Sequence, residues 1–119
     1  MVEGTQHAVW PQWLAAMEGE VALLQPKDDG RMDVQTLAAF PMPAPGMRFN
    51  DGRCDRQGRF WAGTMVRDMS LARPAGGLYR TDAAGLSAPL VQGLVTQNGL
   101  GFSPDGRTMY LSDSHPSVQ

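Results

Sequence analysis

The feature that most constrains this chain is an internal repeat with a period of 48 residues. Each of the two copies has a polar start, a glycine-containing turn and a short apolar stretch, which is the pattern of a β-hairpin. A period of this length is typical of architectures in which one supersecondary unit stacks on the next. Residues 50–61 align with residues 98–109, with identities of Asn50 and Asn98, Gly58 and Gly106, and Arg59 and Arg107.

A four-stranded blade of a β-propeller occupies roughly 40 to 50 residues, so the period predicts one blade per repeat. The chain between the two copies supplies the rest of one blade, and the chain before the first copy supplies part of another. The prolines of residues 41–46 favour an extended connector between these two blades. The predicted strands are residues 77–81 and 86–91 after the first copy, and residues 13–17, 21–24 and 34–40 before it.

The sequence therefore predicts an all-β fold with about two to two and a half four-stranded blades. A closed propeller needs about four to eight blades, and a lone blade cannot bury both of its faces. We expect a partial propeller over residues 13–119, with residues 1–12 unassigned and the remaining blades missing from this chain.

Composition narrows the classes of partner. The 119 residues carry a net charge of -2 and only 18% charged side chains, which argues against a basic face for nucleic acid. The apolar runs are too short to span a membrane, and the first ten residues lack the pattern of a signal peptide. The single cysteine, Cys54, cannot form an internal disulfide, so we expect a cytoplasmic protein with Cys54 packed in the core.

Polar residues begin the innermost strand of each repeat. Arg48 and Asn50 begin one strand, and Asn98 takes the same place one blade later. An asparagine at a strand start can cap a turn, which is a structural role. Two blades that present asparagine toward one central channel can instead form a binding site. The residues alone leave both interpretations open.

The order of several motifs resembles that of the SMP-30/gluconolactonase/LRE family, and the resemblance covers about residues 45 to 115. Several ordered motifs at family spacing are more specific than any one of them. The motifs are Arg48-Phe49-Asn50-Asp51-Gly52, Gly58-Arg59-Phe60-Trp61-Ala62-Gly63-Thr64-Met65, Gly76-Gly77-Leu78-Tyr79-Arg80, Gln97-Asn98-Gly99-Leu100-Gly101-Phe102-Ser103-Pro104-Asp105-Gly106 and Tyr110-Leu111-Ser112-Asp113-Ser114.

The resemblance implies a six-bladed propeller with one divalent cation, calcium or zinc, in the central channel. The family holds this cation with a glutamate, an asparagine and a later aspartate, and Asn98 matches the asparagine. Arg48 and Asn50 match the substrate-contacting residues, and Asp68 stands where some members have a glutamate that contacts the substrate. The aspartate that serves as general base would lie beyond Gln119, so the catalytic residue is unknown.

The resemblance implies a metal-dependent hydrolase of sugar lactones, gluconolactonase-like, of which this chain would be an incomplete and inactive fragment. One alternative is a non-catalytic β-propeller module that binds partners, since the turn of residues 103–107 suits many propellers. Another is a related propeller that hydrolyses aryl esters or phosphotriesters. Converging polar groups at Arg48, Asn50 and Asn98 favour the lactonase, because a scaffold has no need of them.

Overall fold

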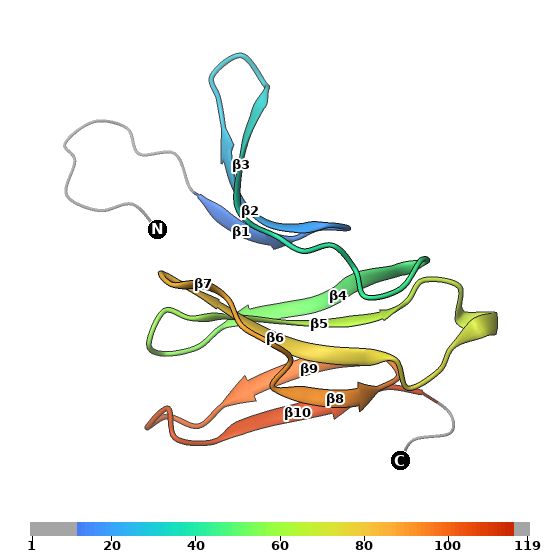
Figure 1. Cartoon of the computed structure of the whole chain (residues 1–119). Coiled ribbons are helices and arrows are strands. Elements are labelled where there is room, and N and C mark those ends of the chain that lie inside the picture. The colour runs from blue at the N-terminus through green and yellow to red at the C-terminus, as the bar shows by residue number, and fades with distance from the viewer. Residues whose placement is uncertain (1–11, 116–119) are drawn as a thin grey trace.

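The computed structural model describes residues 12–115, which fold into three antiparallel sheets that lie one above another (Figure 1). The sheets have strand orders β1-β2-β3, β4-β5-β6 with β7 and β8 both on the outer edge of β6, and β9-β10. The strands are β1 (Trp13–Ala16), β2 (Glu20–Pro26), β3 (Met32–Ala39), β4 (Met47–Cys54), β5 (Phe60–Val66), β6 (Gly76–Asp82), β7 (Gly85–Leu86), β8 (Val91–Leu94), β9 (Gln97–Phe102) and β10 (Met109–Asp113), and a 3₁₀ turn, η1 (Met69–Leu71), follows β5.

The predicted outer strand over residues 86–91 is wrong in its extent. The chain pairs with β6 in two pieces, β7 and β8, with residues 87–90 between them. Pro89 lies in this gap and has no N–H to donate. The hydroxyl of Ser87 partly repairs the ladder, because it accepts a hydrogen bond of 2.9 Å from the main-chain N–H of Arg80.

The middle sheet is buried on both faces. Successive side chains of a strand point to opposite faces, and on β6 Leu78 packs toward the third sheet while Tyr79 packs toward the first. The rings of Tyr79 and Phe40 lie 4.5 Å apart between their centroids, which ties the connector after β3 to the middle sheet. The cluster on one face is Val21, Phe49, Phe60, Ala62 and Tyr79, and that on the other is Leu78, Leu94 and Leu100.

A β-bulge interrupts the pairing of β4 with β5. Phe49 pairs with Thr64 and Gly52 pairs with Ala62, so Asn50 and Asp51 together stand opposite the single residue Gly63. A bulge bends its strand and re-aims the side chains at that point. Here it lets two consecutive polar side chains of β4 reach the same neighbouring strand, β9.

The second and third sheets meet along a seam of contacts between side chains and main chain. Arg53 Nη1 donates to the carbonyl oxygen of Leu100 at 3.0 Å, and Arg56 Nε donates to that of Ser103 at 2.8 Å. Each contact joins residues 47 positions apart, close to the repeat period. We define the β4–β9 seam as the contacts of Asn50, Asp51, Arg53 and Arg56 with the main chain of residues 97–103.

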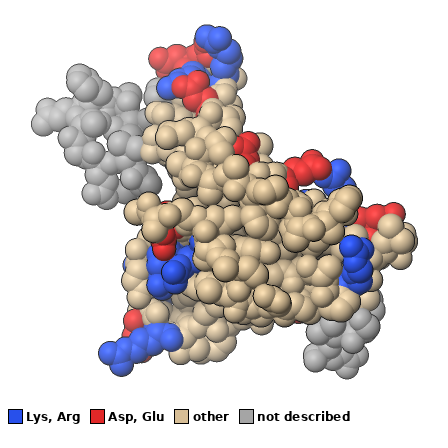
Figure 2. Space-filling view, viewed as in Figure 1, with Lys and Arg blue, Asp and Glu red and all other residues tan. Residues whose placement is uncertain are grey.

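Charged side chains of both signs (Figure 2) and Cys54 lie at the surface of the molecule. Lysine, arginine, aspartate and glutamate side chains gather in small groups of both signs, with a broad uncharged area between them on the face shown in Figure 2. Cys54 is exposed, so its predicted core position is wrong, because it is the last residue of β4 and lies at the rim of the sheet. Among residues 12–115, no helix has the length and apolar character needed to cross a membrane.

Candidate functional site

The bulge of β4 and the start of β9 bring polar groups from two sheets to one place. Asn50 Nδ2 donates to the carbonyl oxygen of Gln97 at 2.7 Å, and the N–H of Gly99 donates to Asp51 Oδ2 at 2.8 Å. These two hydrogen bonds lie on either side of Asn98 in the chain. Asn50 therefore bonds to the main chain directly before Asn98, its partner position in the repeat.

Arg48 orients the amide of Asn50. Arg48 Nη1 donates to Asn50 Oδ1 at 3.2 Å and to the carbonyl oxygen of Phe49 at 2.9 Å. The amide of Asn50 thus accepts from one strand and donates to the other, which fixes its plane. A guanidinium has five N–H donors in a planar fork, and these two contacts use Nη1 alone. The remaining nitrogens of Arg48 make no recorded hydrogen bond within residues 12–115, so they can serve a ligand.

Asn98 offers an amide oxygen to a metal ion, but no cluster of other ligand side chains surrounds it within residues 12–115. Its side chain is exposed and makes no hydrogen bond within residues 12–115, so its amide oxygen is open to a ligand. Amide and carboxylate oxygens are the donors that hard divalent cations prefer. No group of three or more His, Cys, Asp or Glu side chains in the described part of the chain could hold a metal ion.

Asp68 lies in the loop after β5, at the N-cap of η1. Its Oδ1 accepts hydrogen bonds from the hydroxyl of Ser70 at 2.6 Å and from the Ser70 N–H at 3.0 Å, and these bonds lower the pKa of the carboxyl. The pairing of Met47 with Val66 puts this loop at the end of the sheet where β4 begins. The structure joins Arg48 to Asn50 and Asn50 to the residue before Asn98, whereas the hydrogen bonds of Asp68 stay within its own turn.

Three residues that the sequence analysis did not select belong to this place. Asp51 holds Gly99, and the side chain of Gln97 is fully buried against Gly63. A built Cβ on Gly63 would lie 2.4 Å from the Cβ of Gln97, so residue 63 must be glycine while Gln97 stays where it is. A glycine inside a strand indicates that another chain segment approaches the strand closely, and Gly63 carried this signal in the sequence.

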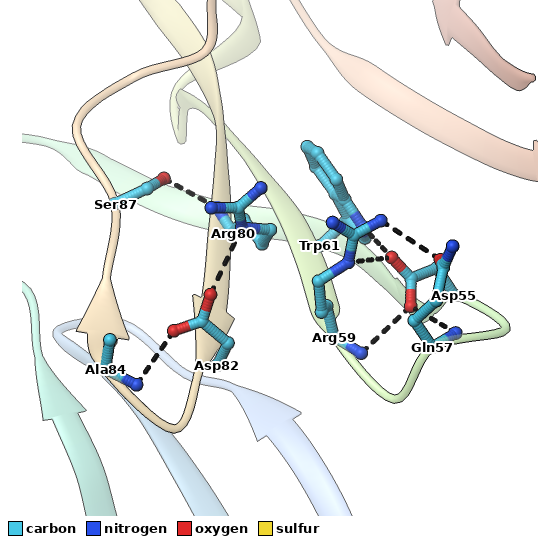
Figure 3. A network of polar contacts seen from close by, with 8 residues as sticks. All are labelled: Asp55, Gln57, Arg59, Trp61, Arg80, Asp82, Ala84 and Ser87. Atoms are coloured by element: carbon cyan, nitrogen blue, oxygen red, sulfur yellow. Dashed lines mark hydrogen bonds and ion pairs between the residues drawn. The ribbon is translucent and has the colours of Figure 1, made fainter. Parts of the chain in front are cut away.

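A second polar cluster, at the opposite end of β4, is centred on the carboxylate of Asp55 (Figure 3). Asp55 Oδ2 accepts from Arg59 Nε at 2.6 Å and from Trp61 Nε1 at 2.9 Å, while its Oδ1 accepts from the N–H groups of Gln57 and Arg59. Burial opposes ionisation of Asp55, but these donors outweigh it and lower the pKa to about 2. Arg59 and Arg80 flank the Trp61 ring at 5.8 and 5.7 Å from its centroid. This cluster closes the turn of the repeat.

The fold identifies the class of protein. The three stacked antiparallel sheets are blades, or parts of blades, of a partial β-propeller, which confirms the predicted all-β fold. The sequence model described as "SMP-30/Gluconolactonase/LRE-like region" matches residues 4–118. The chain belongs to the SMP-30/gluconolactonase/LRE-like family, as the motif resemblance predicted.

Individual relatives agree with this assignment. The 6-deoxy-6-sulfogluconolactonase of Pseudomonas putida is 42% identical over 80 residues, which are 67% of this chain and 27% of that protein. Regucalcin of Xenopus laevis is 37% identical over 84 residues, 68% of this chain and 28% of that protein. The crystal structure of regucalcin from Agrobacterium tumefaciens, described as a calcium-binding protein, superposes with a TM-score of 0.71 at 30% identity and covers 86% of this chain and 32% of that one. The matched part of the chain thus spans about a third or less of each relative.

Proposed function

We propose that this chain forms part of a divalent-cation-dependent hydrolase that opens sugar lactones to their hydroxy acids. The observation that supports this most is the bond from Asn50 to the main chain of Gln97, which ties the polar start of β4 to the chain directly before Asn98. Polar groups of two neighbouring sheets are thereby joined at one place, as a shared binding site requires. The printed name of the Pseudomonas putida relative, a sulfogluconolactonase, supports a sugar lactone as the substrate class.

The roles follow from the chemistry of each group. Arg48 donates from its free nitrogens to the hydroxyls or carbonyl of the sugar lactone, and Asn50 holds the ring against the strand start. Asp68 accepts from a further hydroxyl once the loop after β5 faces the ligand. Asn98 supplies one oxygen to the cation, calcium or zinc, which when bound polarises a carbonyl and lowers the pKa of a bound water. In the reaction, water adds to the carbonyl carbon, the ring C–O bond breaks and the ring oxygen leaves as a hydroxyl.

The proposal predicts chelator-sensitive lactonase activity in the complete natural protein that contains this chain. Glucono-1,5-lactone hydrolysis, followed by proton release in a weakly buffered solution, should stop with a chelator and return with calcium or zinc. Asn98→Ala should lower the rate by about 100-fold or more, because a metal-site oxygen is lost. Gln92→Ala removes an exposed amide on β8 and serves as the control.

Two results would contradict the proposal. If Asn98→Ala turned over the lactone at the rate of Gln92→Ala, Asn98 would not be a ligand. If the protein hydrolysed p-nitrophenyl acetate or a phosphotriester in a cation-dependent way and left the lactone untouched, the scaffold would serve a different ester chemistry.

A further inference from the structure

The side chain of Gln97 is the most unusual buried group near the site. It is fully buried, its Nε2 makes one long hydrogen bond of 3.4 Å to the carbonyl oxygen of Gly99, and its Oε1 has no partner. Burying an unpartnered amide oxygen destabilises the folded state. An apolar side chain of similar size would avoid that cost, so the hydrogen bonds of Gln97 do not explain why this long side chain fits here.

The close packing of Gln97 against Gly63 explains the presence of this long side chain better. Gln97 lies over Gly63, and a built Cβ on Gly63 would approach the Cβ, Cγ and Oε1 of Gln97 to 2.4–2.5 Å. Contacts this short involve the fixed root of the side chain as well as its flexible end, so the neighbour could not simply swing away. Gly63 is also the residue opposite the bulge at Asn50 and Asp51. The bulge, the glycine and the glutamine therefore form one interlocked unit.

We propose that Gln97 is a positioning residue, whose side chain, seated over Gly63, fixes the start of β9 and so sets Asn98 against Asn50. This inference rests on the proposed function, because it names what holds the proposed site together. The main chain of residues 97–99 is bonded to β4 through Asn50 and Asp51. Both hydrogen bonds require that β9 keep its present distance from β4 and from Gly63. Loss of the Gln97 side chain lets β9 settle toward Gly63 and loosens both anchors.

The test is amide hydrogen exchange on the full ¹⁵N-labelled chain, read by NMR at Gly99, whose N–H donates to Asp51. Gln97→Ala should speed this exchange about tenfold or more, because the long side chain no longer fills the space over Gly63. Gln97→Met keeps the length and bulk of the side chain and should stay within about threefold of the natural chain. Val21→Ala, a fully buried change in the first sheet, is the control for a general loss of stability.

Equal acceleration at Gly99 in Gln97→Ala and Val21→Ala would overturn the proposal, because Gln97 would then be only core filling. Fast exchange in Gln97→Met would also overturn it, since shape would not be what matters. A second check pairs Gly63→Ala with Gln97→Gly, which removes the Cβ, Cγ and Oε1 that a Cβ on residue 63 would meet: the double variant should melt at a higher temperature than Gly63→Ala alone. Additive losses would show that the two residues do not share one space.

Ligand binding separates this inference from the proposed function. D-Glucono-1,5-lactam keeps the ring and carbonyl but resists hydrolysis, so its binding can be followed at the side-chain amides of Asn50 and Asn98. We expect Gln97→Ala to weaken binding about fivefold or more relative to Gln97→Met. If the lactam perturbs neither amide in the complete natural protein, the proposed function fails, and the exchange at Gly99 still decides the role of Gln97.

Discussion

Asp55 shows how a single carboxylate holds a turn of the repeat. Its side chain is only 3% exposed and receives hydrogen bonds from Arg59, Trp61 and Gln57, which lower its pKa to about 2. A carboxyl whose folded pKa lies below its unfolded value of 3.8 stabilises the fold when it is ionised. That contribution is complete above about pH 5 and disappears as the pH falls toward 2.

We expect Asp55→Asn to lower the free energy of unfolding at pH 7 by about 2 kcal/mol, because the Arg59 and Trp61 donors lose a charged acceptor. Urea unfolding between pH 7 and pH 2 measures this change. The natural chain should lose about 1–2 kcal/mol more than Asp55→Asn over the acid range. Asp105→Asn, in the exposed turn of the second copy, is the matched control, and a loss as large as that of Asp55→Asn would refute the special role of Asp55.

At the residue scale, the sequence indicated candidate side chains but not the contacts that hold the two strands together. Asn50 and Asn98 were selected because they stand at equal places in a repeat, and Arg48 was selected from the motif resemblance. Asp51 and Gln97 were missed because their roles depend on the bulge opposite Gly63, and a bulge leaves no fixed mark in a strand sequence. The roles of the selected residues in binding stay predictions.

At the scale of elements, one glycine decides how closely three strands approach. A built Cβ on Gly76 would lie 2.3 Å from the carbonyl oxygen of Thr64 on β5 and 2.8 Å from that of Leu94 on β8. Both obstacles are main chain, so relief would require the strands to separate. Substitution at this position therefore tests the pairing of the whole middle sheet.

We expect Gly76→Ala to destabilise the chain by about 3 kcal/mol, as overpacking against fixed main chain does. Gly101→Ala is the control, because its Cβ would meet Tyr110 at an ordinary 3.9 Å and its change should stay within about 1 kcal/mol. Thermal unfolding by circular dichroism measures both. Equal melting temperatures for the two variants would contradict the packing argument.

The order of strands was predictable because alternation and turn residues repeat with the period of the blade. Residues 13–17, 21–24 and 34–40 correspond to β1, β2 and β3, with ends that differ by a few positions. The break between β7 and β8 was not predictable from one proline, since its place depends on where Ser87 can reach Arg80. Whether the domain begins at residue 13 stays a prediction.

For the molecule as a whole, residues 12–115 contain no group of three or more His, Cys, Asp or Glu side chains that could surround a cation beside Asn98. We therefore expect the 119-residue chain by itself to bind calcium with a dissociation constant weaker than about 1 mM. Titration followed at the Asn98 side-chain amide measures this, with magnesium as the comparison cation. Micromolar binding at that amide would show that this chain holds a more complete site than residues 12–115 display.

The β4–β9 seam has a consequence for how such a chain can diverge. Arg53 and Arg56 contact only carbonyl oxygens of the third sheet, and every amino acid carries a carbonyl. The recipient position Ser103 can therefore change in identity without breaking the joint, whereas Leu100 is also a core residue and the two arginines supply the donors. A saturation library scored for folding should be permissive at Ser103 and strict at Arg53, Arg56 and Leu100, so a main-chain acceptor outside the core frees its own position to vary.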